Sequence, residues 1–245
     1  MSDFYAGVFL IDKPVGPSSF TMVRHVRKLL GIKKVGHAGT LDPFASGLLI
    51  ICGGRPATRL ISSFMDGEKE YVATLCLGRQ TSTLDPEGEV VGEGAVGYLS
   101  ERRIEECLAS FRGEQMQEPP AYSALKYKGK PLYYYARKGI EVKKEPRRVN
   151  ILELERIDTK GDLCGYHPEF QIRVVCSKGT YIRTLAADIG TALGCGAYLT
   201  GLRRTRSGPF TIENAVNGQT LSDPAERENI MKSMLSVEDV GNLLQ

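Results

Sequence analysis

The order of strand-like and helix-like segments restricts the fold of this 245-residue chain more than any other feature. Several strand-like segments follow one another with no helix between them, as at 148–157 and 170–176. This order differs from the regular strand–helix–strand alternation of a parallel, doubly wound sheet. We therefore predict an α+β fold with a mixed, mainly antiparallel central sheet flanked by helices.

Apolar periodicity and turn residues predict the individual elements. Strands are expected at 7–12, 48–52, 70–78, 148–157, 170–176 and 199–206. Helices are expected after a cap at Ser18 or Ser19, and at 57–65, 101–111 and 180–193. In the first helix Phe20, Val23 and Val26 recur at helical spacing, and we expect them to share its buried face.

Composition predicts a cytoplasmic protein that binds neither membrane nor metal. No apolar run approaches the roughly 18 residues of a membrane span, and no secretory signal is visible. The six cysteines form no C-x-x-C pair, which favours reduced, structural thiols. The three histidines form no closely spaced ligand pair, so we expect no metal site.

The segment 118–150 combines positive charge with aromatic side chains. It holds nine basic residues, three acidic residues and five of the eleven tyrosines. Basic side chains interleaved with aromatic ones suit a nucleic acid whose bases can stack, although composition alone fits a solvated loop equally well. The segment 211–245 has six acidic and two basic residues, and we do not expect it to bind RNA.

One apparent cofactor motif lacks its structural context. The residues at 92–97 match G-x-G-x-x-G. A dinucleotide-binding unit needs a second parallel strand after the following helix, and no apolar strand follows 101–111. We therefore do not expect dinucleotide binding.

The tetrapeptide Thr-Leu-Asp-Pro occurs twice, at 40–43 and 83–86. Asp85 begins an ordinary β-turn sequence, Asp-Pro-Glu-Gly, which predicts a structural role. Asp42 instead lies among three glycines and close to His37, and Pro43 disfavours helical geometry at Asp42. We therefore expect a loop to present Asp42 to a ligand.

Six motifs in a fixed order then suggest a family. They are Lys13–Ser19, Val35–Gly47, Lys69–Tyr71, Gln117–Lys126, Cys176–Leu185 and Leu199–Arg204. Together they resemble the motifs of the TruB-type tRNA pseudouridine synthases, and the resemblance covers nearly the whole chain. It implies the pseudouridine synthase fold.

The resemblance also implies a reaction, the isomerisation of uridine to pseudouridine at position 55 in the TΨC loop of tRNA. The N1–C1′ bond breaks, the base turns and C5 takes the place of N1, so no cofactor is needed. The resemblance makes Asp42 the carboxylate nucleophile. We therefore expect Asp42→Ala to abolish activity and Asp85→Ala to retain it. The target base must flip out of the RNA to react.

Five further residues acquire substrate-binding roles from the resemblance. Arg183 resembles the arginine that pairs with the nucleophile and keeps it ionised. Tyr71 resembles the tyrosine that stacks on the target base, and His37 the histidine that holds the substrate loop open. Tyr181 and Leu202 resemble residues that line the uracil pocket.

The expected organisation is one catalytic domain at 1–210, with 118–150 as an RNA-binding insertion that closes on the T arm. Lys126, Lys128 and Lys130 are expected to contact the RNA backbone. The segment 211–245 is expected to be an acidic tail. The PUA module that most family members carry is not seen after it, so either the protein lacks this module or the sequence is truncated. The expected partner is the T-arm stem-loop of tRNA, with a monomeric protein and no obligatory protein partner.

Two alternatives stay open at this point. The first is a pseudouridine synthase that acts on another RNA or within a guide-RNA complex. The second is an RNA chaperone or binding protein that keeps the fold without activity. The presence of Asp42, Tyr71 and Arg183 together argues against the second.

Overall fold

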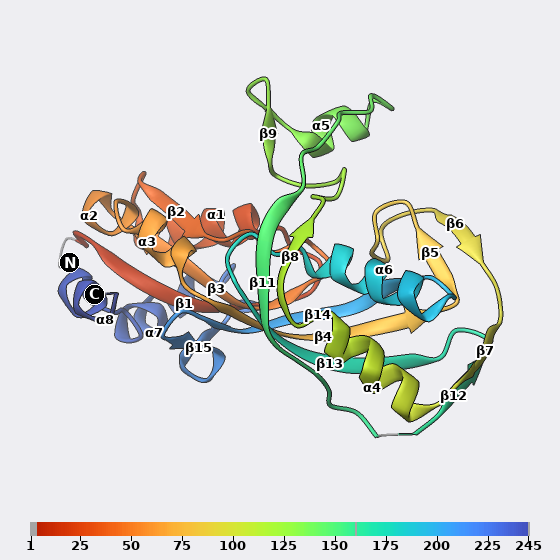
Figure 1. Cartoon of the computed structure of the whole chain (residues 1–245). Helices are drawn as coiled ribbons and strands as arrows, with labels where there is room; N and C mark the ends of the chain where they lie inside the picture. Colours follow the sequence, from red (N-terminus) through yellow and green to blue (C-terminus); the bar gives the residue numbers. More distant parts are fainter. Residues whose placement is uncertain (1–3, 160, 245) are drawn as a thin grey trace. The chain divides into compact units, whose positions relative to one another are not determined.

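The computed structural model describes residues 4–159 and 161–244, which divide into two compact units (Figure 1). Unit 1 comprises the chain up to Tyr71 and from Arg203 onward, and unit 2 comprises Val72–Leu202. The strands β4 (Lys69–Leu77) and β14 (Ala197–Ser207) each contribute residues to both units.

The sheet of unit 1 is built around β3 (Ser46–Gly53). On it, β1 (Gly7–Lys13) and β2 (Val35–Ala38) pair antiparallel, and the unit-1 part of β14 pairs in parallel. The short strands β15 (Phe210–Thr211) and β16 (Val216–Asn217) pair with β14 and β1. All of β3 after Ser46 is buried, which explains its continuous apolar sequence.

Helices α1 (Ser19–Leu30), α2 (Arg55–Thr58) and α3 (Ile61–Asp66) contact β2 or β3, and α2 and α3 replace the single helix predicted at 57–65. The Ser18 side chain accepts a hydrogen bond from the Thr21 amide at 3.1 Å and so caps α1. Phe20 is 57% exposed, so our expectation of a buried Phe20 is wrong. At about 100° per residue, it lies some 60° beyond the arc that contains Val23 and the other buried residues.

The acidic segment 211–245 is folded in its described part. It forms η1 (Ile212–Asn214), η2 (Pro224–Glu226), α7 (Arg227–Lys232) and α8 (Val237–Leu243) besides β16. The Val8 amide donates to the Leu235 carbonyl at 3.0 Å, and the Leu235 amide to the Val8 carbonyl at 2.9 Å. Val240 lies in the same core cluster as Val8. The segment therefore completes the core of unit 1, while the predicted domain boundary at 210 stays a prediction.

In unit 2 the strand order is β14-β4-β13-β11-β8. Strand β11 (Arg147–Arg156) pairs antiparallel with β8 (Gly113–Gln117) on one side and with β13 (Glu169–Cys176) on the other. Helix α4 (Glu101–Ser110) contacts β11 and α6 (Ile182–Leu193). Two small sheets pair β5 (Arg79–Thr81) with β6 (Val90–Glu93) and β7 (Val96–Leu99) with β12 (Leu163–Gly165).

The G-x-G-x-x-G sequence at 92–97 runs from β6 into β7 and begins no helix. A strand, β8, does follow α4, but its sequence, G-E-Q-M-Q, is not apolar, in agreement with our expectation, and it pairs antiparallel with β11. These elements therefore do not form the parallel unit that binds dinucleotides.

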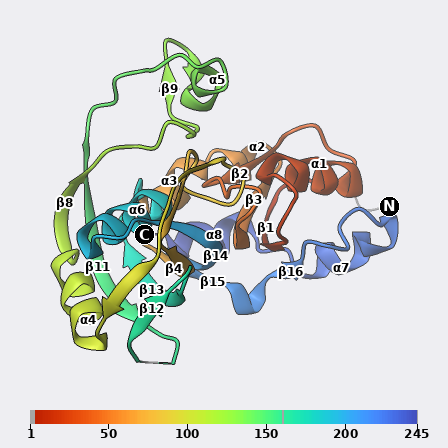
Figure 2. The ribbon, with the colours of Figure 1, turned by 90° about the vertical axis from the view of Figure 1, so that its right-hand side faces the viewer.

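The insertion occupies residues 118–146, because β11 begins at Arg147. It consists of a hairpin, β9 (Lys126–Tyr127) and β10 (Lys130–Pro131), followed by α5 (Leu132–Ala136). Lys128 and Gly129 have φ values of 45° and 80°, as a two-residue hairpin turn requires. Figures 1 and 2 both show these elements beyond the ends of β8 and β11, away from α4 and α6.

The predicted fold class is confirmed: the sheet is mixed and mainly antiparallel, and helices flank it. Within the described residues, none of the helices has the length and apolar character that crossing a membrane would require.

Candidate active site

The loop that carries Asp42 joins the antiparallel strands β2 and β3 of unit 1. The Ala45 amide donates to the Asp42 carbonyl at 3.1 Å, which closes a tight turn after the aspartate. Gly47 has a φ of 103°, and a Cβ atom there would lie 2.3 Å from the backbone oxygen of Arg204. As predicted, Asp42 is therefore presented from a loop, and glycine is required where that loop enters β3.

The Lys13–Ser19 motif holds this loop in place. The hydroxyl of Ser19 accepts from the Leu41 amide and donates to the Leu41 carbonyl, both at 2.9 Å. The Gly16 amide donates to the Pro43 carbonyl at 2.8 Å. The residues on both sides of Asp42 are thus fixed by hydrogen bonds from one short segment.

Lys13, whose side chain is fully excluded from solvent, also holds this loop in place through its ammonium group. It donates to the carbonyls of Pro14 and Pro17 at 2.8 Å and to that of Pro43 at 3.4 Å. A buried charge needs such acceptors, and here they come from both segments that meet beside Asp42.

Arg204 is the buried cation on the other side of the loop, with 2% of its surface exposed. Its guanidinium donates to the carbonyls of Leu48 at 2.7 Å and Gly39 at 3.1 Å. Burial and then the Arg204 cation lower the pKa of His37, so this half-buried ring on β2 is neutral at pH 7. A neutral ring suits stacking against a base, as expected for His37.

Tyr71 is the last residue of unit 1, on β4, and its side chain is half-buried. Two residues earlier, the buried ammonium of Lys69 donates to the carbonyls of Met65 at 2.6 Å and Gly67 at 2.5 Å. The K-x-Y motif therefore fixes the start of β4 to the end of α3 and so positions Tyr71.

Arg183 lies in the first turn of α6 in unit 2 and is 5% exposed. It donates to Asp85 Oδ2 at 2.9 Å and to the carbonyls of Thr83 at 3.0 Å and Tyr122 at 2.7 Å. The predicted pairing of Arg183 with Asp42 joins residues of different units and stays a prediction.

Asp85 requires a correction to our interpretation of it as a simple turn residue, and we replace our expectation that Asp85→Ala retains activity. The turn exists, because Asp85 Oδ1 accepts from the Glu87 amide at 3.0 Å and from the Thr83 hydroxyl at 2.5 Å. The side chain is, however, 2% exposed and forms an ion pair with Arg183. Leu84, which lies between Thr83 and Asp85 in the sequence, adopts a φ of 64°. This value is strained for leucine, and the hydrogen bonds and the ion pair of Asp85 maintain it.

The other predicted residues of unit 2 lie on α6, on β14 and in the insertion. Tyr181 precedes α6, and Leu202 is half-buried on β14. Lys126, Lys128 and Lys130 are exposed on the β9–β10 hairpin. The structure thus groups His37 with Asp42 on one hairpin of unit 1, and Tyr181 with Arg183 at the start of α6; the roles of these residues stay predictions.

Four residues that support the site have no role in our sequence-based prediction: Lys13, Ser19, Arg204 and Gln117. Gln117 is buried; its side chain accepts from the Tyr181 amide at 2.8 Å and donates to the Tyr181 carbonyl at 3.1 Å. All four belong to the family motifs, which was the available signal.

Two family models match the chain. The model described as TruB family pseudouridylate synthase (N terminal domain) matches residues 27–182, and that of the tRNA pseudouridylate synthase B C-terminal domain matches residues 183–240. The chain belongs to the TruB family of pseudouridylate synthases, a family of isomerases.

Individual relatives agree with this assignment. The tRNA pseudouridine synthase B of Desulfotalea psychrophila is 63% identical over 243 residues, which are 99% of this chain and 98% of the relative. A solved Cbf5-Nop10-Gar1 complex is 31% identical, with a TM-score of 0.72 over 97% of this chain and 62% of that one. An H/ACA RNP bound to a substrate RNA containing 2'-deoxyuridine is 29% identical, with a TM-score of 0.69 over 97% and 61%. This chain therefore spans about three fifths of those two solved chains.

Proposed function

We propose that this chain converts uridine to pseudouridine at position 55 in the TΨC loop of tRNA, with Asp42 as the nucleophile and without a cofactor. Membership of the TruB family, with a relative named tRNA pseudouridine synthase B along almost its whole length, supports the reaction and the substrate class. The observation that carries the role of Asp42 is the bracing of its loop by Lys13, Ser19 and Arg204. A nucleophile must be held in position and also be reachable by the substrate; Asp42 is half-buried, whereas Asp85 is 2% exposed and already paired with Arg183.

The chemistry is balanced within the substrate. The N1–C1′ bond breaks, the C5–C1′ bond forms, and overall one proton leaves C5 while N1 gains one. Nothing is oxidised, reduced or hydrolysed, so the protein must supply a carboxylate, a place for the turning base and a route for the proton. In this proposal Asp42 supplies the carboxylate, and Tyr71 stacks on the base and accepts the proton.

The remaining residues bind the substrate in this proposal. Arg183 keeps the nucleophile ionised, Tyr181 and Leu202 line the uracil pocket, and neutral His37 stacks in the opened T loop. The insertion closes on the T arm, with its lysines against the backbone. We further propose that the chain acts as a monomer without a guide RNA or protein partner.

The test uses the purified full chain and a T-arm stem-loop, with pseudouridine mapped after incubation. Asp42→Ala should bind the RNA with unchanged affinity and form no pseudouridine. Asp223→Ala is the matched control, because it alters another Asp-Pro turn, in the acidic segment, and should keep full activity. Pseudouridine formed by Asp42→Ala would refute the proposed nucleophile.

The same assay tests the alternative that the chain acts only within a guide-RNA complex. The purified chain should modify the stem-loop with no other component present. Modification that appears only after a cell extract or a second RNA is added would favour the guide-RNA alternative.

A further inference from the structure

The insertion holds a cluster of side chains of which the proposed function assigns a role only to Lys130. We define the tyrosine–lysine cluster as Tyr134 with Lys130 and Lys138, supported by Tyr135 and Tyr127. The Lys130 ammonium lies 4.3 Å from the Tyr134 ring centroid and that of Lys138 lies 4.6 Å away. Two cations therefore converge on one phenol ring.

The ring at the centre of the cluster is held in a fixed orientation. Tyr135 packs edge-on against Tyr134 with centroids 5.5 Å apart, and against Tyr127 with centroids 5.7 Å apart. The Tyr135 hydroxyl donates to the Tyr127 carbonyl at 3.1 Å, and buried Leu132 anchors α5 beneath. Because the tight hairpin turn fixes Lys130 as well, little of this arrangement has to be ordered by a ligand.

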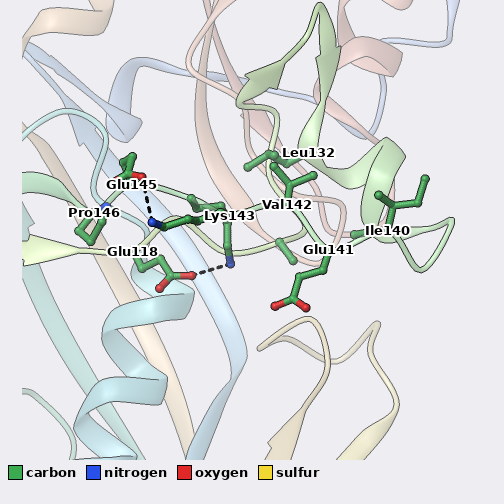
Figure 3. A pocket seen from close by; sticks show the side chains of 11 residues that line it. Glu118, Leu132, Ile140, Glu141, Val142, Lys143, Glu145 and Pro146 are labelled. Carbon is green, nitrogen blue, oxygen red and sulfur yellow. Dashed lines mark ion pairs between the residues drawn. The ribbon is translucent and has the colours of Figure 1, made fainter.

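Two of the three carboxylates of the insertion pair with lysines outside the cluster. In the described part of the chain, Glu118 pairs with Lys144 at 2.8 Å and Glu145 with Lys143 at 3.9 Å. Glu141 lines a cavity of about 750 Å³ on the side of α5 shown in Figure 3. None of the ion pairs within residues 4–159 and 161–244 includes a lysine of the cluster. The cluster thus carries two positive charges with no counterion from these residues.

The phenol oxygen of Tyr134 is arranged as a third donor. Lys130 Nζ donates to it at 3.1 Å, and the Lys138 ammonium lies 4.6 Å from the centroid of the same ring. A phenol oxygen has two lone pairs and one proton, so its own O–H points away from the Lys130 ammonium that donates to it. Together the ammonium groups lower the pKa of Tyr134 to about 8, with Lys138 as the larger cause.

We propose that Lys130, Lys138 and the Tyr134 hydroxyl form a binding site for one phosphate group, filled by a backbone phosphate of the substrate RNA. A phosphodiester has two non-bridging oxygens, which can accept from the two ammonium groups and the hydroxyl, and its single negative charge neutralises one of the two positive charges. The choice of RNA as the source of the phosphate rests on the proposed function. The site is more specific than general contact by the hairpin lysines, because Lys126 and Lys128 have no part in it.

The first test measures binding of the T-arm stem-loop as a function of salt. Lys130→Gln and Lys138→Gln should each weaken binding roughly tenfold and reduce the slope of log K against log salt by roughly 0.7–0.9. The double variant should be little weaker than either single variant, because both lysines serve one phosphate. Tyr134→Phe should weaken binding several-fold and leave the slope unchanged.

The control is Lys232→Gln, which removes the same charge from a lysine that pairs with Glu228 at 2.7 Å in the acidic segment. It should bind like the unaltered protein. Two results overturn the shared site: unchanged slopes in both single variants, or additive losses with a slope change twice as large in the double variant. Circular dichroism and melting curves establish that each variant is folded.

A second measurement tests the site independently of RNA. Inorganic phosphate added to the free protein should shift the Tyr134 ring signals in a ¹³C-tyrosine spectrum, and the Lys130→Gln/Lys138→Gln variant should show no such shift. Absence of a shift in the unaltered protein overturns the site. Pseudouridine mapping in the same preparations keeps the two proposals distinct: a modified T arm with no phosphate effect refutes only the site, whereas a phosphate effect with no modification refutes only the function.

Discussion

Replacing Asp85 with asparagine should destabilise the protein far more than a turn substitution would. The change keeps the shape of the side chain and removes one charge from an ion pair whose members are 2% and 5% exposed, with Arg183 Nη1 2.9 Å from Asp85 Oδ2. Breaking one partner of a buried pair costs about 3–5 kcal/mol. Arg183 keeps the carbonyls of Thr83 and Tyr122, so we expect a loss near the lower end, about 3 kcal/mol.

The assay is a melting curve together with turnover on the T-arm stem-loop. For a chain of this size 1 kcal/mol moves the midpoint by about 2–4 °C, so Asp85→Asn should melt about 6–12 °C lower. Turnover should fall more than RNA affinity does, because Arg183 would be held by two carbonyls alone and positioned less firmly. Asp223→Asn is the control: exposed Asp223 also precedes a proline and accepts from the Ala225 amide at 2.9 Å, and its loss should cost within about 0.5 kcal/mol. Equal midpoints and equal turnover for the two variants would refute the reasoning.

Three further changes test other parts of the structure. Gly47→Ala places a Cβ atom 2.3 Å from the Arg204 carbonyl oxygen, so it should lower both the melting temperature and turnover; an unaltered loop in a crystal structure of the variant would contradict this. Gln117→Leu leaves the partly buried amide and carbonyl of Tyr181 without these side-chain partners, and chemical denaturation should show a loss of about 1–3 kcal/mol. Tyr134 should titrate near pH 8 by NMR, whereas Tyr134→Phe lacks that titration. Because this pKa is depressed in the folded protein, stability should rise between about pH 8 and 10, while RNA affinity falls as phenolate opposes phosphate.

Strong apolar periodicity made several elements predictable from the sequence. Strand β3 and helix α4 appear within a few residues of their predicted ends, because one is a continuous buried run and the other has an amphipathic repeat and a Ser100 cap. Strands β2 and β8 were missed. Their sequences, V-G-H-A and G-E-Q-M-Q, have little strand propensity, and pairing with β3 and β11 determines them.

The sequence was enough to select the candidate nucleophile, but not to identify the side chains that hold the site in place. Asp42 could be selected from the sequence, because glycine and proline constrain a loop locally. The functions of Lys13 and Gln117 could not, because both act on backbone groups of distant segments, 30 and 64 residues away. Side chains that bind backbone leave no partner residue type in the sequence by which they could be recognised.

The two Thr-Leu-Asp-Pro copies show where local chemistry stops being informative. Both aspartates precede a proline and both begin a turn, so the tetrapeptide explains what they share. What separates them is burial and the partner: Asp85 meets Arg183, a residue 98 positions later, which no turn rule could indicate. If Arg183 also serves the nucleophile, as the family resemblance implies, then Asp85 sets the position of the cation on which the ionisation of Asp42 depends. The second copy would then contribute to catalysis through Arg183, and Asp85→Asn would impair turnover without any contact between Asp85 and the substrate.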